Sequence, residues 1–282
     1  MSNGAGAKTQ SWTALEQAAE EIRTPCGDGE MVWRSWGAGG DPLVLLHGGA
    51  GSWLHWIETI PAFAGDRRVV AADLPGLGSS ASPPHDADGP AIAAIVAEGL
   101  KRVVGAQTQV DLAGFSFGGV VAGLAAASGA IRLRSLTLVG SGGLGVITTT
   151  ARLERVRDKT GAERDEANRT NLHRWMIADA AAIDARAIAI QDWNSRHARL
   201  DSRPVGVSGL LLGALPRVSA PVAGIWGAAD HAVQGDTGRV EAALRLVCRN
   251  LRFEVVPRAG HWVAYEAPEA FERALRICLE GA

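Results

Sequence analysis

A serine between glycines lies where an apolar run ends and a helix-like run begins. Residues 114–119 read Gly-Phe-Ser-Phe-Gly-Gly, after the apolar run 110–113 and before the helix-like run 120–127. A serine at the apex of a sharp strand-to-helix turn has a strained backbone, and glycines beside it leave room where a Cβ would collide. Its hydroxyl stands at a helix N-terminus, where backbone N–H groups and the helix dipole favour negative charge. The pattern therefore predicts that Ser116 is a nucleophile, if a base and an acid lie close to it.

A glycine-rich turn before a helix also occurs in nucleotide-binding proteins. A phosphate-binding loop has Lys followed by Ser or Thr after its last glycine, whereas Val120 and Val121 follow here. A dinucleotide-binding turn has three spaced glycines directly after the first strand and an acidic residue further on, and the match to that pattern is also poor. The sequence therefore favours a nucleophile, and the rest of the chain must supply its partners.

A serine hydroxyl is a poor nucleophile, so it needs an adjacent base that is itself oriented by a third group. We predict that the base is His261, which follows the last predicted strand, stands beside Gly260 and comes after Ser116 in the chain. The other histidines fit the role less well. They lie in a proline-rich loop, in a charged segment, next to the proposed acid or at the first glycine-rich turn: His85, His173, His197, His231 and His47.

The predicted acid is Asp230, which lies just past the penultimate predicted strand. Its carboxylate would hold the imidazole in one tautomer and stabilise the imidazolium as it forms. Three other aspartates have better structural explanations. Asp236 suits the start of the next helix, Asp111 lies in a strand ahead of the serine, and Asp73 braces a Pro-Gly turn.

Acyl transfer also needs hydrogen-bond donors for the oxyanion that develops on the substrate carbonyl, each worth about 3–4 kcal/mol. We predict two backbone donors for this oxyanion hole. One is the N–H of Phe117, and the other is the N–H of Gly49 in the turn 47–52, His-Gly-Gly-Ala-Gly-Ser. A glycine there lets the backbone approach the substrate closely. A tight turn alone would explain one glycine-rich loop, but not two at the same edge of a sheet.

Strands and helices alternate along most of the chain and predict the scaffold for these residues. Strands are predicted at residues 31–36, 43–46, 69–72, 110–113, 136–139, 222–226 and 253–256. Helices are predicted at 12–22 (capped by Ser11), in a short stretch ending near 60, and at 91–104, 120–127, 240–247 and 268–279. This alternation indicates an α/β fold with a mostly parallel central sheet flanked by helices. The predicted site residues all follow strands, so they converge on the carboxyl edge of the sheet, where ligands bind.

A charged segment interrupts the alternation. Between Ala151 and Arg203, 20 of 53 residues are charged, against 21% in the whole chain, and few of the residues favour strands. We interpret the segment as part of a helical insertion with much solvated surface. The predicted organisation is an N-terminal tail and helix at 1–22, a first part of the α/β core at 23–143, a helical cap at 144–215 and a second part of the core at 216–282, with residues 1–10 disordered.

Composition restricts the classes of partner. The 282-residue chain is 47% hydrophobic, and its net charge of −2 gives no electrostatic footprint for nucleic acid or an anionic membrane. It has no signal-peptide h-region and no apolar run of about 18–20 residues, and its three scattered cysteines indicate reduced thiols. We therefore expect a cytoplasmic protein with a small-molecule substrate, without metal, cofactor, nucleic acid or membrane. Whether it forms a homo-oligomer stays open.

The combined pattern resembles the serine-nucleophile branch of the α/β-hydrolase superfamily over about residues 25–282. The shared features are the chain order Ser116, Asp230, His261 and a His-Gly-Gly turn upstream of the Gly-x-Ser-x-Gly elbow. The resemblance implies a cap inserted after the sixth strand. Dehalogenases and epoxide hydrolases of this superfamily need a carboxylate at the elbow, where this chain has Ser116.

Within the superfamily the chain resembles the meta-cleavage-product hydrolases, which break a C–C bond beside a ketone in aromatic-ring degradation. The resemblance rests on Gly260-His261-Trp262 followed by Tyr265-Glu266, and on Gly-Ser-Trp after the first glycine-rich turn. It implies that Trp262 lines the substrate pocket and that Phe117 lies beside the nucleophile.

The chain also departs from that family at the predicted substrate site. Phe115 and His55 stand where the family has asparagines, and we predict that both contact the substrate. The family uses a cap arginine to bind the substrate carboxylate. The candidates here are Arg196, which we include among the predicted substrate-binding residues, and the nearby Arg199 and Arg203.

Three functions are compatible with the sequence. The first is a serine hydrolase that forms an acyl-enzyme on an ester-type carbonyl substrate; transfer of the acyl group to an alcohol shares its first step. Trp175 and Trp193 in the charged segment favour a small hydrophobic substrate. The second is a C–C hydrolase of the meta-cleavage-product type. The third, of another class, is a ligand-binding protein that keeps the fold without turnover, because a fold alone does not prove a function.

Overall fold

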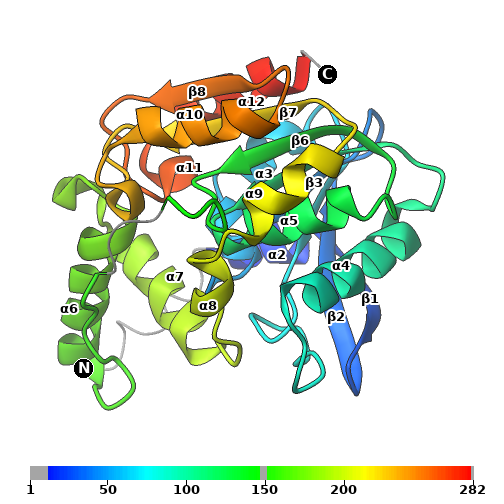
Figure 1. Ribbon diagram of the computed structural model, residues 1–282. Helices are drawn as coiled ribbons and strands as arrows, with labels where there is room; N and C mark the ends of the chain where they lie inside the picture. Colours follow the sequence, from blue (N-terminus) through cyan, green and yellow to red (C-terminus); the bar gives the residue numbers. More distant parts are fainter. Residues whose placement is uncertain (1–11, 147–150, 281–282) are drawn as a thin grey trace.

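Eight strands form one sheet in the computed structural model, which describes residues 12–146 and 151–280. Their order across the sheet is β1-β2-β4-β3-β5-β6-β7-β8 (Figure 1). β1 and β2 form an antiparallel hairpin, β2 pairs antiparallel with β4, and all pairs from β4 to β8 are parallel. The bounds are β1 Glu20–Cys26, β2 Gly29–Trp36, β3 Leu43–Leu46, β4 Val69–Ala72, β5 Val110–Phe115, β6 Leu133–Val139, β7 Val222–Gly227 and β8 Arg252–Val256.

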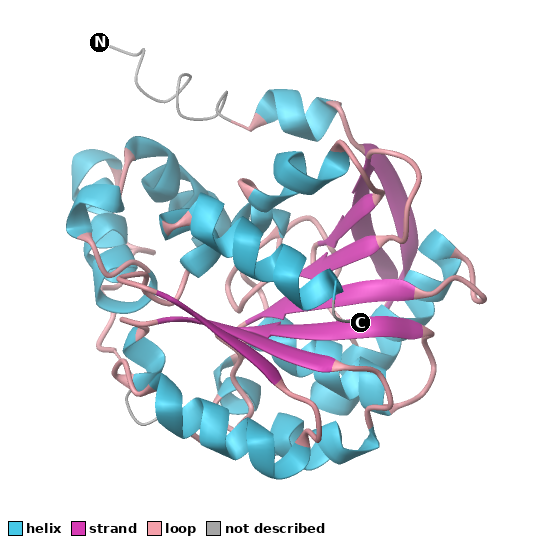
Figure 2. Ribbon diagram, turned by 90° about the horizontal axis from the view of Figure 1, so that it is seen from above, coloured by secondary structure: helices cyan, strands magenta, loops and turns pink. Residues whose placement is uncertain are grey.

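Helices cover both faces of this sheet (Figure 2). Val44 and Leu46 of β3 face one core cluster, while Leu43 and Leu45 face the other, so the unbroken aliphatic run serves two cores. The predicted α/β fold, with a mostly parallel sheet between helices, is confirmed. On the first face lie α4 Gly89–Val104, α5 Phe117–Ala127 and α10 Thr237–Val247; on the second lie η1 Trp53–Trp56, α3 Thr59–Ala64, α11 Val263–Glu266 and α12 Pro268–Glu280.

The predicted helix over residues 12–22 is wrong in its second half. α2 covers only Thr13–Gln17, and residues from Glu20 onward form β1. Apolar residues at positions 12, 15, 19 and 22 fit a helical face, but every residue of β1 pairs with β2, from Glu20 opposite Ser35 to Cys26 opposite Gly29. This pairing with an adjacent strand outweighs the local helical pattern.

α2 packs on the body of this chain. Trp12 is buried, and Nε1 of Trp36 donates a hydrogen bond to the carbonyl oxygen of Leu15 at 2.7 Å. The proposed cap Ser11 and the expected disorder of residues 1–10 lie outside the described residues.

Residues 144–215, which we call the insertion, lie between β6 and β7, and their described part is helical. In Figure 1, α6, α7 and α8 lie beyond the arrowheads of the strands, whereas α9 lies along α5. A Cβ at Gly123 of α5 would collide with Leu211 of α9, so these two helices pack closely. The elements are α6 Gly161–Asn171, the π-helix η2 Leu172–Met176, η3 Ala180–Ala182, α7 Ala185–Arg196, α8 Arg203–Gly206 and α9 Leu210–Ala214.

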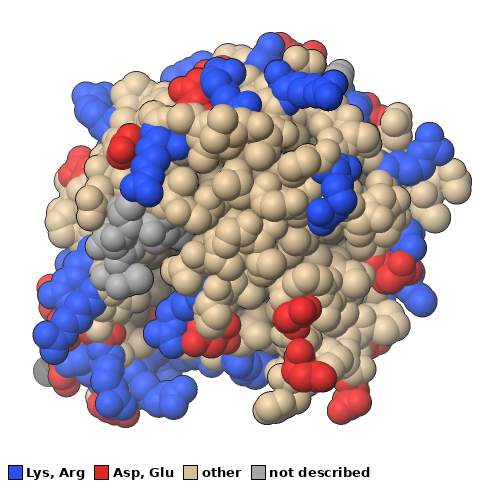
Figure 3. Space-filling model, viewed as in Figure 1, with Lys and Arg blue, Asp and Glu red and all other residues tan. Residues whose placement is uncertain are grey.

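Charged side chains of both signs are present on the face of the molecule shown in Figure 3. Lysine and arginine side chains are most numerous at the lower left, with some acidic side chains among them, and aspartate and glutamate are most numerous at the lower right, while the centre carries neither. This distribution agrees with the small net charge of the chain. Within the described residues, no helix has the length and apolar character needed to cross a membrane. Cys26, Cys248 and Cys278 are free thiols and buried.

Candidate active site

Ser116 lies at the turn between β5 and α5 in the strained conformation that the sequence predicts. Its φ of 51° and ψ of −116° lie in a region that L-residues rarely adopt. A Cβ at Gly114 would lie 2.6 Å from the Cα of Gly119, and a Cβ at Gly118 would collide with the carbonyl oxygen of Leu46. Glycines are therefore required here for α5 to pack against β5 and β3.

Ser116, His261 and Asp230 form one continuous chain of hydrogen bonds. Oγ of Ser116 is 3.0 Å from Nε2 of His261, and Nδ1 of His261 is 2.9 Å from Oδ2 of Asp230. An ionised carboxylate can only accept, so Nδ1 carries a proton and Nε2 accepts from the serine hydroxyl. Asp230 is fully buried and His261 is 3% exposed, so little water competes for these bonds. This geometry suits removal of the hydroxyl proton and stabilisation of the imidazolium that results.

Turns after three parallel strands bring these side chains together. Ser116 follows β5, Asp230 follows β7 and His261 follows β8. Between them, Gly140 ends β6 with φ 49°, and a Cβ there would lie 3.3 Å from Nδ1 of His261. The missing side chain leaves room for the imidazole to reach across β6. The second oxygen of Asp230 accepts from the N–H of Ala232 at 2.8 Å, which holds the carboxylate in place.

Glu266 holds the loop that carries His261. Its carboxylate accepts hydrogen bonds from the N–H groups of Gly260 (2.7 Å), Ala178 (3.1 Å) and Asp179 (2.7 Å). The last two belong to the insertion, so one side chain ties the histidine loop to the segment above the site. Hydrogen bonds that backbone N–H groups donate to a carboxylate are among the stronger ones. The orientation of His261 therefore depends on the seating of the insertion.

The glycine-rich turn 47–52 packs against the elbow. A Cβ at Gly48 would lie 3.3 Å from Cβ of Ser116, and a Cβ at Gly49 would lie 3.7 Å from Cβ of Phe117. In the part of the chain that the structure describes, the N–H of Gly49 makes no hydrogen bond. Phe117 is the first residue of α5, so its N–H has no partner within the helix. The structure thus brings the two predicted oxyanion donors to adjacent turns.

His55 lies beneath this turn and holds it. Its Nδ1 accepts from the N–H of Gly48 at 3.2 Å, and its Nε2 is 3.4 Å from the amide of Asn194 in α7. Burial, with smaller contributions from His47 and His261, lowers the pKa of His55 well below its usual value. The imidazole therefore stays neutral, with Nδ1 as the acceptor for Gly48 and Nε2 directed at the amide of Asn194. His55 therefore supports the turn that carries Gly49; its predicted contact with substrate stays a prediction.

Phe115 and Trp262 pack around the two histidines. Phe115 is 3% exposed, with its ring 5.0 Å from that of His261 and 5.4 Å from that of His55. Trp262 is 1% exposed, stacks on Tyr265 at 4.3 Å and donates from Nε1 to the carbonyl oxygen of His55 at 2.8 Å. Both rings pack against the histidines and help to fix their positions. Because each ring is almost fully buried, its predicted contact with substrate stays a prediction.

The three candidate arginines of the insertion have other partners. Arg196, at the end of α7, is 56% exposed and pairs with Asp192 at 2.9 Å. Arg199 donates to the carbonyl oxygens of Gly78 and Ser80, and Arg203 pairs with Asp201. In the described part of the chain, no hydrogen bond or ion pair joins any of the three to Ser116, His261 or Asp230.

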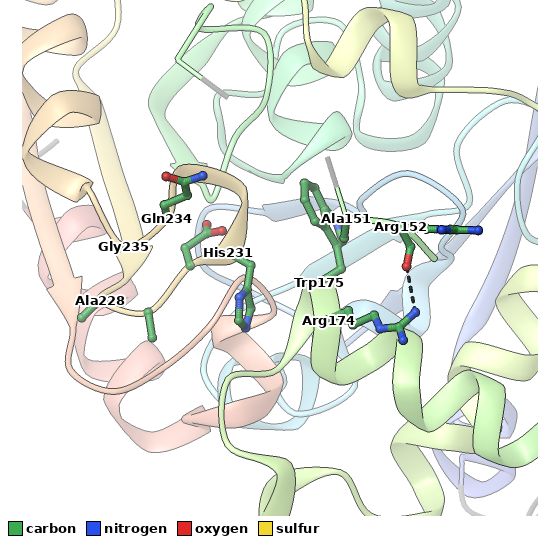
Figure 4. Close-up of a pocket in the computed structure, with 10 residues that line it drawn as sticks. Ala151, Arg152, Arg174, Trp175, Ala228, His231, Gln234 and Gly235 are labelled. Carbon is green, nitrogen blue, oxygen red and sulfur yellow. Dashed lines mark hydrogen bonds between the residues drawn. The ribbon is translucent and has the colours of Figure 1, made fainter. Parts of the chain in front are cut away.

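A hollow of about 820 Å³ borders the site from the side of the acid (Figure 4). Trp175 lines it and also lies 5.7 Å from the ring of His261. Arg174 and Arg152 stand on the opposite side of the hollow from His231, and a guanidinium nitrogen of Arg174 donates to the carbonyl oxygen of Arg152 at 2.9 Å. The lining includes Asp230 but not Ser116, so this space lies beside the hydrogen-bonded chain.

Sequence reasoning missed the residues that act across long distances in the chain. Asn194 and Arg174 belong to no local motif. Glu266 belongs to the recognised pattern after His261, but that pattern did not predict its contacts with Ala178 and Asp179. Among residues 12–146 and 151–280, no group of three His, Cys, Asp or Glu side chains has an arrangement that could hold a metal ion.

Comparison with known proteins gives matches over nearly the whole chain. The alpha/beta hydrolase family matches residues 43–274. The chain is 31% identical to the dihydrolipoyllysine-residue acetyltransferase component of the acetoin cleaving system of Pseudomonas putida, over 83% of this chain and 62% of that protein. It is 29% identical to 2-hydroxy-6-oxononadienedioate/2-hydroxy-6-oxononatrienedioate hydrolase of Paraburkholderia phymatum, over 95% of both chains.

Solved structures share the same fold. The carboxylesterase CesB from Bacillus subtilis superimposes with a TM-score of 0.79 at 18% identity, covering 99% of this chain and 97% of that one. At this identity the likeness concerns the arrangement of the strands and helices.

Proposed function

The chain belongs to the alpha/beta hydrolase family, and we propose that it is a serine hydrolase acting on an ester-type carbonyl substrate. The observation that carries this proposal is the hydrogen-bonded chain from Ser116 through His261 to Asp230, with distances of 3.0 and 2.9 Å. A strained serine at a glycine-flanked elbow, joined to a buried imidazole and carboxylate, is the arrangement that activates a hydroxyl for attack.

In the proposed first step, Ser116 Oγ attacks the substrate carbonyl carbon while Nε2 of His261 takes the hydroxyl proton. Asp230 stabilises the imidazolium through Nδ1. The carbonyl oxygen becomes an oxyanion, which the N–H groups of Gly49 and Phe117 stabilise. The tetrahedral intermediate then expels the alcohol, which receives its proton from His261, and an acyl group remains on Ser116.

In the proposed second step, a water molecule attacks the acyl-enzyme. His261 takes a proton from the water, the same two N–H groups stabilise the oxyanion, and the proton returns to Ser116 as the carboxylic acid leaves. These steps use only side chains and backbone of this chain and one water. In this proposal the insertion, residues 144–215, is a cap over the site, and Trp175 beside the hollow favours a hydrophobic acyl or alcohol group.

C–C hydrolysis is the second candidate. One observation supports it: 29% identity with the 2-hydroxy-6-oxononadienedioate/2-hydroxy-6-oxononatrienedioate hydrolase over 95% of both chains. At positions 115 and 55, however, this chain has Phe and His, both buried and packed against His261 or the glycine-rich turn. We therefore rank it below ester hydrolysis.

The test is intact-mass spectrometry after treatment with a fluorophosphonate, followed by assays on p-nitrophenyl esters and on a dienoate C–C substrate. We expect one adduct on the wild type and none on Ser116→Ala. Ser128→Ala is the matched control, because Ser128 lies at the other end of α5, where its hydroxyl donates to the carbonyl oxygen of Ala125. It should label like the wild type.

The absence of an adduct on folded wild-type protein would contradict the proposal and would favour a ligand-binding protein on the same fold. If an adduct forms, turnover of the dienoate but not of the esters would make C–C hydrolysis the function.

A further inference from the structure

A segment of the insertion crosses the proposed active site and is attached to the core at both of its ends. We call residues 199–208 the bridging segment. At its start, the N–H of Arg199 donates to the carbonyl oxygen of Gly76 at 2.9 Å, and the guanidinium donates to Gly78 and Ser80. These three core residues belong to the turn after β4.

The far end of the bridging segment is attached to the turn after β6. The carbonyl oxygen of Gly206 accepts from the N–H of Gly143 at 2.7 Å, and that of Ser208 accepts from the N–H of Gly145 at 3.1 Å. The order of strands in this region is β4-β3-β5-β6. A segment fixed to the outer two turns must therefore pass over the carboxyl ends of β3 and β5, whose turns carry Gly49 and Ser116.

Ser202 is the residue of the bridging segment that meets the glycine-rich turn. A Cβ at Gly49 would collide with Oγ of Ser202 and would lie 3.2 Å from its Cβ. The same added Cβ would lie 3.7 Å from Cβ of Phe117, so the Ser202 hydroxyl lies against Gly49 at the place where the glycine-rich turn meets the start of α5. A side chain at position 49 would therefore require the Ser202 hydroxyl to move.

The side chain of Ser202 forms no cap hydrogen bond at the start of α8. Its backbone carbonyl accepts from the N–H of Gly206 at 3.0 Å, which fixes the backbone, but no hydrogen bond of its Oγ is found among residues 12–146 and 151–280. The side chain is half-buried, so it is neither a freely solvated surface group nor an orphan in the core. A hydroxyl rotates freely and can donate to any acceptor that arrives beside it.

We propose that Ser202 is a third donor to the oxyanion, supplied by the insertion. This proposal rests on the proposed serine-hydrolase function. The hydroxyl would donate to the substrate oxygen as negative charge develops on it, beside the N–H groups of Gly49 and Phe117. A donor of this kind acts more strongly on the transition state than on the bound substrate, so it raises kcat rather than lowering KM. The oxyanion hole is then complete only when the bridging segment is seated.

The test compares Ser202→Ala with Ser208→Ala in the full chain. Ser208 lies on the same segment, and its hydroxyl donates to the carbonyl oxygen of Val205 at 2.6 Å, so its loss should leave kcat unchanged. For Ser202→Ala we expect kcat on a p-nitrophenyl ester to fall about 10- to 100-fold, with KM within about twofold of the wild type. Thermal unfolding of both variants checks that they fold.

A trifluoromethyl ketone supplies a readout that a merely structural role would not change. Ser116 adds to its carbonyl carbon and an oxyanion forms in the proposed hole, so its inhibition constant should rise in Ser202→Ala by about the same factor as kcat falls. Unchanged or increased kcat in a folded Ser202→Ala that still reacts with fluorophosphonate would overturn this inference and leave the proposed function intact. Failure of the wild type to react would instead remove the proposed function.

Discussion

Asp111 and Asp230 are equally buried in the same sheet, and their partners differ. Asp111, near the start of β5, accepts from Arg67 and Arg134 at 2.5 Å each through one oxygen and from the hydroxyl of Ser135 at 2.5 Å through the other. Asp230, past the end of β7, accepts from the imidazole of His261 and from one backbone N–H. Both side chains are 0% exposed.

The difference lies in what each partner can do with a proton. A guanidinium keeps its charge at any ordinary pH, so Asp111 forms a fixed ionic cluster that joins the amino ends of the strands. An imidazole can gain and lose a proton near neutral pH, so Asp230 is placed to respond to a proton moved by His261. Residue type and burial therefore do not distinguish a structural aspartate from a proposed catalytic one in this sheet. The residue that each aspartate contacts does distinguish them.

The largest effect is expected for Asp230→Asn. The amide cannot hold Nδ1 of His261 in the protonated tautomer or stabilise the imidazolium, so kcat for ester hydrolysis should fall by about 10⁴, equivalent to about 5.5 kcal/mol. The circular dichroism spectrum and the midpoint of thermal unfolding, both measured on the unlabelled protein, should stay close to those of the wild type. Steady-state kinetics on a p-nitrophenyl ester measure the loss.

Asp236→Asn is the matched control for that variant. Asp236 accepts from the N–H of Arg239 at the start of α10 and has no contact with His261 in the described part of the chain. It should cost about 1 kcal/mol of stability or less and leave kcat unchanged. Normal activity of Asp230→Asn together with a large loss in Asp236→Asn would reverse the assignment of the acid.

The same substitution at the other buried aspartate should act on stability instead. Asp111→Asn leaves two guanidinium groups, which are 12% and 27% exposed, without their negative partner. We expect the free energy of unfolding to fall by about 3 kcal/mol, with kcat per folded molecule unchanged. Urea unfolding and active-site titration measure the two quantities. A loss of kcat without a loss of stability would remove the contrast between the two aspartates.

The structure was predictable from the sequence where neighbouring residues alone decide the backbone conformation. The elbow 114–119 needs glycines on both sides of a strained serine, and the apolar runs 43–46 and 69–72 match β3 and β4 residue for residue. The prediction failed at residues 18–22, where a helical spacing and a strand pattern coincide and only pairing with β2 decides.

Contacts between distant segments left no local signal. Ser202 meets Gly49 across 153 positions of the chain, and Glu266 reaches Ala178 and Asp179 across 88 and 87 positions. Such pairs follow from how the insertion folds back over the sheet, which depends on the packing of many residues at once. The geometry of the core turns was therefore predictable from the sequence, whereas the contacts of the insertion needed the structure.

His55 is also buried, but in the described part of the chain it has no carboxylate partner, unlike His261. His55 is 3% exposed, and burial lowers its pKa well below its usual value, so it stays neutral when folded. Below the unfolded pKa of about 6.5, the unfolded chain binds a proton that the folded chain does not. Stability should therefore fall as the pH drops below about 6.5, by about 1.4 kcal/mol per pH unit for this group.

His55→Asn should remove that part of the dependence. An asparagine at this position can still accept from the N–H of Gly48 but does not titrate. Urea unfolding between pH 5.5 and 7.5 should give a smaller slope for the variant than for the wild type. Some slope should remain, because burial also lowers the pKa of His47. Equal slopes for both proteins would mean that His55 is charged in the folded state.

The smallest effect is expected at a third aspartate, Asp192, when the partner that lies at the surface is removed. Asp192 of α7 is 26% exposed and accepts from Arg164, which is buried, as well as from Arg196, which is 56% exposed. Arg196→Ala leaves the buried partner in place, so stability should change by less than about 0.5 kcal/mol, and KM for a neutral ester should stay within about twofold. Urea unfolding and kinetics on the ester and on a dienoate carboxylate measure this. A tenfold or larger rise in KM for the dienoate alone would instead support the substrate contact that the sequence predicts for Arg196, because only an anionic substrate would lose a partner.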